Sequence, residues 1–510
     1  MSRPVRRPVR EVILGILFRV GAFLSSIVNI LLIPEYISRQ AYGIYSFATS
    51  RVITTFTTIQ EFSRFWIFRE ESYGYRVLYS GLLFSILLAS LSYIVTIVVL
   101  VTLYSLKLHL ALVIGVLAAI FVLFDFMLTT CNVYAPHNAQ LLIFIVKILQ
   151  ASIVVILILT RLLDVFNLIL LITVCYLTSL TVGILKFRKL IFSNRSNIFT
   201  DWKRWFKKYQ IPLMSILANI AYVVDAYFIT YIVGFSVVSG FFLSLSISYN
   251  IFSIFGSTFM GMISLLIITR DIEKVKAYTY IIASLTIPTY IFLIIFSKYV
   301  LYVYGLKYVQ YSTILQILSI YGLTLLFLKT IRGLSLGIDV SDVEVLQISE
   351  LSKTSAYKVQ FYRVITSITY LVLLIPCILT ISTLYNSKML TLVIWSSLLV
   401  ARNVLETSLI YLMVFRKIEK EPLQKIWNIL LKPTLKFLAI SLTSILILYK
   451  YLNYITKLFT TTNMINTIIN LALLYTPYIT LTLTIEILTD TYLRTITKAI
   501  LHKIIRQTTP

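Results

Sequence analysis

Eight ionisable side chains lie inside long apolar stretches of the chain, and they are its first candidates for chemistry. The cations are Arg19, Arg51, Lys147 and Arg402, and the acids are Asp125, Asp225, Glu406 and Glu486. A charge at the centre of a bilayer costs about 2.5–3.5 kcal/mol on insertion scales. We therefore expect these groups to face a bundle interior or a water-filled cavity rather than lipid.

Polar neighbours share a helix face with the cations. Residues three, four and seven apart lie on one face of a helix. This spacing groups Arg19 with Ser26 and Asn29, Arg51 with Thr55 and Thr58, Asp125 with Thr129 and Asn132, and Lys147 with Gln140 and Gln150. We expect the cations Arg19, Arg51 and Lys147 to bind an anionic ligand in a cavity. Ser26, Asn29, Thr55, Thr58 and Gln150 are then expected to form its polar wall.

The acidic side chains allow two interpretations. Asp225 and Asp125 are candidates for binding a coupling proton or Na⁺, but Asp225 is equally suited to balance one of the arginines. Arg402 and Glu406 are four residues apart on one predicted helix, which favours a simple ion pair. Glu486 is near a predicted helix end and is expected to reach the lipid headgroups.

The composition shows what must hold these groups in place. Of 510 residues, 59% are hydrophobic and 13% are charged, whereas soluble domains carry about 25% charged residues. From Val77 to Leu106 there is no Asp, Glu, Lys or Arg. A membrane-spanning helix needs about 20 apolar residues, so this stretch is long enough to span. Alternation with period two is absent, which excludes barrel strands.

The apolar stretches predict an all-α polytopic membrane protein with about fourteen transmembrane helices. The predicted spans are 11–33, 41–63, 77–104, 110–130, 141–160, 164–185, 211–233, 237–267, 277–297, 311–331, 364–385, 389–415, 434–456 and 464–488. Because Arg19 interrupts the first apolar run and no small-residue cleavage site follows, that run is interpreted as a retained helix.

Basic residues orient the predicted bundle. With the N-terminus inside, the inner segments hold 33 of the 45 Lys and Arg residues and the outer loops hold 8. Cytoplasmic loops are enriched in basic residues, so both termini are expected in the cytoplasm. The net charge of +25 then reflects topology rather than nucleic-acid binding. The inner segment from Trp202 to Lys208 is interpreted as an ordinary basic loop or as an interfacial helix touching anionic membrane lipids.

The chain divides into two similar halves. Arg39-Gln-Ala-Tyr-Gly43-Ile-Tyr45-Ser46 follows the first predicted span and Ser236-Val-Val-Ser-Gly240-Phe-Phe242-Leu243 follows the seventh. Both segments place Gly-x-aromatic at the start of the next helix. Six helices per repeat give two lobes of the same orientation. We predict a first lobe at 1–190, a basic cytoplasmic linker at 191–210, a second lobe at 211–420 and two additional helices at 421–510.

The residues needed for catalysis or for a resident cofactor are missing. Cys131, Cys175 and Cys377 have no metal-ligand or disulfide spacing, and the three histidines are scattered. No G-x-x-x-x-G-K-[ST] segment binds a nucleotide. The acidic cluster Asp339-Val-Ser-Asp342-Val-Glu344 lies in a predicted inner loop and is interpreted as solvated charge. We expect no cofactor, no metal and no enzymatic activity.

Several short segments together resemble the polysaccharide and oligosaccharide flippases of the multidrug/oligosaccharidyl-lipid/polysaccharide exporter superfamily, often called Wzx-like proteins. They are Arg19, Ile37-Ser-Arg-Gln-Ala-Tyr-Gly43-Ile-Tyr45, Tyr209-Gln-Ile-Pro212-Leu213, Asp225 with Gly240-Phe-Phe242, and Tyr304-Gly305-Leu-Lys-Tyr308. The resemblance spans most of the chain and rests on the order of these segments, because each of them is degenerate.

The resemblance implies movement of a polyprenyl-(di)phosphate-linked oligosaccharide to the outer leaflet by alternating access. Arg19 and Arg51 match the general positions of cavity cations in such flippases, whereas the second lobe has few ionisable residues for a headgroup site. The resemblance also implies a plasma-membrane location and an association with glycan-assembly enzymes. The alternatives are an ion-coupled drug or metabolite exporter of the same superfamily and a membrane glycosyltransferase or polymerase. The basic first lobe argues against the exporter, and the absence of an outer pair of carboxylates argues against the enzyme.

The predicted topology can be tested by cysteine labelling in a variant that lacks the three native cysteines. Cysteines introduced at Ser196 and Thr354 should be protected from an impermeant thiol reagent added outside intact cells. One introduced at Ser387 should react, because the basic-residue distribution places it in an outer loop. Labelling of the first two from outside would reverse the orientation.

Overall fold

The computed structural model describes residues 8–72, 75–192, 197–207, 209–251, 272–338, 350, 352–385, 387–419, 421–459 and 464–495. Within these ranges the regular elements are helices and no strand is present. Twelve of the helices are long and apolar enough to cross a membrane. The prediction of an all-α polytopic membrane protein is therefore confirmed.

Two further predicted spans correspond to less regular elements. The span 41–63 is α2 (Arg39–Phe47), a π-helical turn (Ala48–Val52) and α3 (Ile53–Ser72), which follow one another without a break. At about 1.5 Å per residue this continuous stretch is longer than the hydrocarbon core, although its Thr and Gln residues lower its hydropathy. The span 237–267 is described as an apolar helix over Phe235–Ile251, and its remainder lies outside the described residues.

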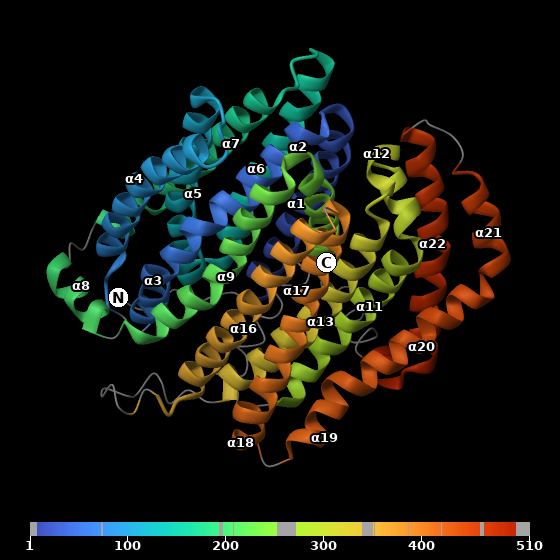
Figure 1. The fold of residues 1–510 in the computed structure, drawn as a ribbon. Coiled ribbons are helices and arrows are strands. Elements are labelled where there is room, and N and C mark those ends of the chain that lie inside the picture. The colour runs from blue at the N-terminus through green and yellow to red at the C-terminus, as the bar shows by residue number, and fades with distance from the viewer. Residues whose placement is uncertain are drawn as a thin grey trace, which may run out of the picture. The chain divides into compact units, whose positions relative to one another are not determined.

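One compact unit comprises residues 1–243 with 382–388. Its helices are α1 (Pro8–Tyr36), the α2–α3 stretch, α4 (Leu78–Thr102), α5 (Leu108–Tyr134), α6 (Pro136–Leu159), α7 (Val165–Phe192), α8 (Ile198–Lys207) and α9 (Gln210–Val233). Within it α4 packs on α5, α1 on α6, and α3 on both α5 and α9 (Figure 1). Its core is formed by apolar side chains such as Phe62, Met127 and Trp205, which converge from α3, α5 and α8.

The second unit comprises residues 244–381 and 389–510. Its helices are α11 (Ile272–Tyr302), α12 (Leu306–Val309), α13 (Ser312–Ile338), α16 (Ser355–Leu384), α17 (Lys388–Ile410), α18 (Arg416–Ile418), α19 (Pro422–Ile426), α20 (Lys432–Ile447), α21 (Tyr449–Lys457) and α22 (Met464–Thr489). π-Helical turns Tyr411–Phe415 and Trp427–Leu431 join α17 to α18 and α19 to α20. Helix α11 is central here, because α13, α20 and α22 all pack against it (Figure 1).

Several helices of this unit extend beyond their predicted ends. Helix α13 continues to Ile338 and α16 begins at Ser355, so Arg332 and Arg363 lie in helices rather than in the predicted inner loop. The predicted span 434–456 is displaced toward the N-terminus, because the apolar helical stretch runs from Pro422 to Ile447. The chain then turns at Leu448 into α21, a short separate helix.

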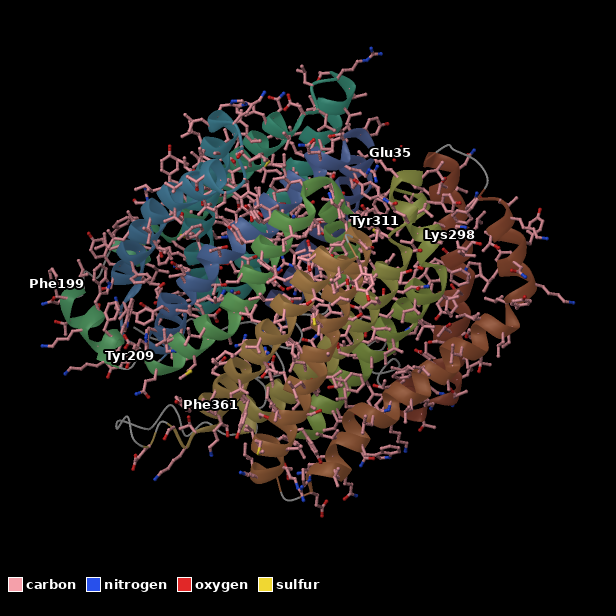
Figure 2. The ribbon with its side chains drawn as sticks, viewed as in Figure 1. Glu35, Phe199, Tyr209, Lys298, Tyr311 and Phe361 are labelled. Atoms are coloured by element: carbon pink, nitrogen blue, oxygen red, sulfur yellow. The ribbon has the colours of Figure 1, made fainter. Side chains whose placement is uncertain are left out.

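The predicted basic linker contains α8, and one face of α8 is docked on the ends of α3 and α4. The Arg204 guanidinium donates to both carboxylate oxygens of Glu70 at 2.7 and 2.5 Å, and the indole of the buried Trp205 donates to the same carboxylate. Trp202 donates to the Ser80 carbonyl, and Ser80 donates to Asp201. This face contacts protein rather than lipid headgroups. The opposite face carries Phe199, which points outward and is 82% exposed (Figure 2).

Hydrogen bonding also fixes the turn between α3 and α4. The Glu71 carboxylate accepts from the backbone N–H groups of Val77 and Leu78 and from the Tyr134 hydroxyl. Burial raises the pKa of the Glu71 carboxyl above its ordinary value, and these hydrogen bonds oppose that shift. The hydrogen bond with Glu70 raises the pKa of the Arg204 guanidinium. Both contacts hold α8 and the α3–α4 turn together at one end of the unit.

Gly43 allows the closest backbone approach in the first unit. A Cβ atom at this position would lie 2.0 Å from the Phe235 carbonyl oxygen. Ser38 starts this helix by accepting a hydrogen bond from the Ala41 N–H at 3.2 Å, so α2 enters in a fixed orientation. Gly43, the glycine of the Gly-x-aromatic segment, is therefore required because it packs against Phe235, the first residue of the helix Phe235–Ile251.

Gly43→Ala should strongly destabilise the protein, because the obstructing atom is backbone and cannot rotate away. We expect a loss of several kcal/mol, at the upper end of single-residue effects. Gly183→Ala is the matched control, since its new Cβ would meet side-chain atoms of Leu142 and Met127 at 3.2 Å. Thermal unfolding of the purified variants in detergent should separate the two. Equal stability would show that the Gly43 contact is not maintained.

Candidate functional site

Arg51 lies in the π-helical turn that separates α2 from α3. This turn, Ala48–Val52, places one extra residue in the helix path beside the arginine. Its guanidinium carbon lies 5.7 Å from the centre of the Phe242 ring, within the range of a cation–π contact. π-Helical turns occur frequently at functional sites. The arginine is half-buried, as a ligand-binding cation in a membrane cavity must be.

Hydroxyl groups lie next to Arg51. The Thr55 hydroxyl donates to the Arg51 carbonyl at 2.9 Å and lies 3.4 Å from the Tyr227 hydroxyl on α9. The Tyr227 carbonyl accepts from the Tyr104 hydroxyl at 2.8 Å. The ring of Phe47 contacts the rings of both tyrosines. The predicted residues Arg51 and Thr55 are thus brought together with an aromatic and hydroxyl-rich part of α9.

Arg19, Ser26 and Asn29 follow one face of α1, which packs along α6. Arg19 is half-buried and Asn29 is buried. Among the described residues, neither the oxygen nor the nitrogen of the Asn29 amide has a hydrogen-bond partner. The Ser26 hydroxyl instead donates to the Ala22 carbonyl of its own helix at 2.8 Å. Of this predicted polar stripe, Asn29 is the member that keeps buried hydrogen-bonding capacity for a ligand or water.

Helix α6, which packs along α1, carries the third predicted cation. Lys147 is half-buried, and Gln150, one turn later, is buried and donates to the Tyr45 hydroxyl of α2 at 3.4 Å. Thr58, predicted for the polar wall, is also buried on α3. The predicted wall residues therefore come from α1, α3 and α6, all within the first unit.

The two candidate acids have different surroundings. Asp125 on α5 forms an ion pair with Arg64 of α3 at 3.6 Å, and Arg64 also contacts Glu61 at 2.6 Å. The partner of Asp125 is therefore Arg64, which the sequence analysis placed in the inner loop between the predicted spans 41–63 and 77–104. Asp225 is 1% exposed on α9, which packs on α3 and on the π-helical turn that holds Arg51. Of the two acids, Asp225 is thus on the helix that packs nearest to the predicted cation.

The second unit contains a charge cluster that the sequence prediction missed. Glu406 of α17 is fully buried and accepts a hydrogen bond from Arg332 of α13. The Arg363 guanidinium of α16 lies 3.7 Å from the same carboxylate oxygen. Arg402 donates to the Ser367 hydroxyl and lies over the Tyr370 ring, and its expected ion pair with Glu406 stays a prediction.

Polar contacts around this cluster join three helices. Asn403 of α17 donates to the Thr324 hydroxyl of α13, and Trp395 of α17 donates to the Tyr370 hydroxyl of α16. Glu406 itself bridges α13 and α16. Charges buried this deeply are retained only with partners of opposite sign. The cluster therefore ties α13, α16 and α17 together in a way that apolar packing alone would not specify.

The missed cluster left a weak signal in the sequence. Apolar residues continue past Arg332 through Leu334 and Leu336, and others precede Arg363 at Ala356 and Val359. Helical periodicity therefore extended through both arginines. The positive-inside rule assigned them to a loop, because basic residues ordinarily mark the cytoplasmic end of a span. The expected scarcity of ionisable groups in the second half followed from that error.

The arrangement is suited to holding an anion and shows no metal site. In the part of the chain that is described, no group of three His, Cys, Asp or Glu side chains lies close enough to hold a metal ion. Guanidinium groups offer forked donors that match phosphate or carboxylate oxygens. In partly dry surroundings such contacts are stronger than in water.

Comparison with known proteins gives matches at the level of structure. No protein-family model and no curated protein sequence matches the chain. The lipid II flippase MurJ in an inward closed conformation is 14% identical, with a TM-score of 0.58 over 94% of this chain and 99% of MurJ. An inward-facing multidrug resistance MATE transporter of the MOP superfamily is 14% identical, with a TM-score of 0.54 over 77% of this chain and 95% of that transporter.

A third structure is a MOP-superfamily transporter from Pyrococcus furiosus, described as having a binding pocket of reverse polarity. It is 16% identical, with a TM-score of 0.50 over 79% of this chain and 93% of that protein. The chain has the fold of these transporters. The likeness is one of fold, and it agrees with the fold that the sequence resemblance implies. The chain is accordingly a multi-pass membrane protein.

Glu406→Gln should destabilise the second unit, because it removes the carboxylate that neutralises two guanidinium groups. Breaking a buried ion pair by removing one partner typically costs about 3–5 kcal/mol. The matched control is Glu421→Gln, since Glu421 is exposed at the start of α19. Thermal unfolding in detergent should fall markedly for the first variant and little for the second. Equal unfolding temperatures would contradict a structural role for the cluster.

Proposed function

We propose that this protein is a flippase for a lipid with an anionic, phosphate-linked headgroup. Its substrate class is a polyprenyl-(di)phosphate-linked oligosaccharide, and transport from the cytoplasmic to the outer leaflet proceeds by alternating access. The observation that carries the proposal is Arg51, a half-buried cation in the π-helical turn Ala48–Val52. A phosphate crosses lipid only if its charge is compensated on the way.

The surroundings of Arg51 support an exchangeable ligand. The Phe242 ring lies beside the guanidinium, and the Thr55 hydroxyl, which is bonded to the Arg51 backbone carbonyl, lies 3.4 Å from the Tyr227 hydroxyl. Hydroxyl groups can solvate a phosphate or a sugar without adding negative charge to its binding site. Arg19 and Lys147 add cations on α1 and α6, and Asn29 adds an amide with unused hydrogen-bonding capacity.

The extent of the structural likeness also favours a lipid flippase over a drug exporter. The match to the lipid II flippase extends over 94% of this chain, whereas the two other transporters match 77% and 79%. The proposal includes a location in the plasma membrane, with both termini in the cytoplasm, and no catalytic turnover by the protein itself. Association with the enzymes that assemble the lipid-linked glycan follows from the same proposal.

Arg51→Ala and Arg19→Ala should abolish flipping in proteoliposomes, because each removes a donor group from the passage of the headgroup. Arg51→Lys should retain partial activity, since the charge remains but the forked donor geometry is lost. Arg39→Ala is the matched control, because Arg39 is exposed at the start of α2. The assay measures access of an impermeant reagent to the headgroup of a labelled lipid-linked oligosaccharide, with the substrate's mass checked before and after.

Three results would contradict this proposal. Recovery of flipping in the double variant Arg51→Ala/Asp225→Asn would show that Arg51 serves to balance Asp225. Because Asp125 already pairs with Arg64, Asp225 is the acid to test. A change in substrate mass, with a new glycosidic bond, would indicate an enzyme. Transport of a small cationic drug without flipping of the lipid would favour the exporter alternative.

A further inference from the structure

The buried residues of α22 form one stripe along the helix. They recur every three or four residues, and all but one of them are polar: Thr467, Asn470, Leu474, Tyr478, Thr482 and Glu486, followed by Asp490 just beyond the helix end. The rest of α22 is largely exposed on the protein surface, as expected of a lipid-facing helix. A buried polar stripe in such a helix is costly unless its groups are satisfied.

Most of the stripe is satisfied by hydrogen bonds. Asn470 donates to the Leu458 carbonyl at 3.1 Å, and Thr482 donates to the Tyr478 carbonyl at 2.8 Å. The Tyr478 hydroxyl donates to the Pro288 carbonyl of α11 at 3.0 Å. These contacts fix the buried face of α22 against its neighbours.

Glu486 is the exception. Its side chain is 0% exposed, and among the described residues neither carboxylate oxygen has a hydrogen-bond partner. The sequence expectation that Glu486 reaches the lipid headgroups is therefore wrong. Glu406 is equally buried but has Arg332 and Arg363 beside it. An ionised carboxylate without such partners would cost far more than a neutral carboxylic acid.

A second carboxyl group, that of Asp490, lies one helical turn from Glu486. Asp490 follows Glu486 by four residues, so the two carboxyl groups share a face of the chain. Lys436 of α20 donates to Asp490 Oδ2 at 3.0 Å and to the Thr489 carbonyl at 3.1 Å. Leu493 N–H donates to the other carboxylate oxygen of Asp490 at 2.9 Å. Although burial raises the pKa of Asp490, these hydrogen bonds outweigh it and lower that pKa below the ordinary value.

The other titratable groups near this end of α22 are not carboxylates. Tyr478 lies two turns before Glu486 on the same stripe. From α11, Tyr280 contacts the Tyr492 ring, and Lys276 lies over the same ring. The Arg494 guanidinium donates to the Ile487 carbonyl at 3.2 Å and to the Leu488 carbonyl. The Lys436 ammonium group is bonded to Asp490, the carboxylate one turn from Glu486.

We infer that Glu486 is a proton-binding site buried in the membrane, with Lys436 and Asp490 connecting it to the aqueous side. When Glu486 releases its proton to water, Lys436 moves its ion pair from Asp490 to the new carboxylate, and Asp490 becomes hydrated. A metal cation fits this site poorly, because it requires several oxygen ligands that the described residues do not gather here. This inference does not depend on the identity of the transported substrate.

The test is infrared difference spectroscopy of the full-length protein in lipid nanodiscs. At neutral pH the wild type should show the C=O stretch of a protonated carboxylic acid, and this band should disappear on alkaline titration. Glu486→Gln should lack the band, whereas the control Glu421→Gln, which alters an exposed carboxylate, should retain it. The same band in Glu486→Gln as in the wild type would overturn the assignment.

A second variant tests the exchange of Lys436 and does not require Glu486 to be changed. Asp490→Asn frees Lys436 to pair with Glu486, so the band should be lost at neutral pH while the protein remains folded by size-exclusion chromatography. An unchanged band in Asp490→Asn would overturn the exchange. Replacing sodium with choline in the buffer should leave the wild-type band unaltered. A band that appears only without sodium would overturn the proton site in favour of a metal-cation site.

Discussion

The structure depends on one constraint: a charge that leaves water for a lipid-surrounded bundle must be compensated within the protein. In the first unit Arg64 compensates Asp125, and Arg204 on α8 compensates Glu70. In the second unit Arg332 compensates Glu406, and Lys436 compensates Asp490. Each of these pairs joins different helices or helix ends. The requirement for charge compensation thus specifies which helices are neighbours. Apolar packing alone would not specify this, because one apolar helix face can pack against many others.

Arg51 and the arginines that bind Glu406 have different surroundings. Glu406 in the second unit is bound by guanidinium groups from α13 and α16, and additional side-chain hydrogen bonds join the same helices. Such a network fixes one arrangement of the three helices. In the first unit the Arg51 guanidinium lies over the Phe242 ring, and the Arg51 backbone carbonyl accepts a hydrogen bond from the Thr55 hydroxyl.

The sequence predicted the apolar helices well and the polar ones less well. Helix α4 was placed within a few residues because its stretch contains no charge, and α5 because apolar residues dominate it. The helix ends near Arg332 and Arg363 were misplaced, because a basic residue next to an apolar stretch was interpreted as part of a cytoplasmic loop. Whether it instead pairs with Glu406, 74 residues from Arg332, is a property of the folded chain. The pairing of Asp125 with Arg64 could not be predicted for the same reason.

Among the proposed site residues, the sequence identified which side chains are polar and share a face but not their contacts. The stripe from Arg51 to Thr55 was predictable from helical spacing, whereas the contact between Thr55 and Tyr227 depends on how α9 packs. Burial of Glu486 was missed because its position near a helix end suggested exposure. Its place on the buried stripe of α22 was visible only once the packing partners α11 and α20 were known.

The π-helical turn at Ala48–Val52 also sets how the two ends of one long helix are oriented relative to each other. One residue corresponds to about 100° of rotation in an α-helix, so the extra residue decides which side chains of α2 and α3 share a face. If this turn relaxed to regular α-helix, the face that carries Gly43 and Tyr45 would rotate relative to Thr55 and Thr58. The contacts of Gly43 with Phe235 and of Thr55 with Tyr227 hold both faces in place at once. The position of Arg51 is therefore a consequence of helical phase, maintained by contacts on either side of it.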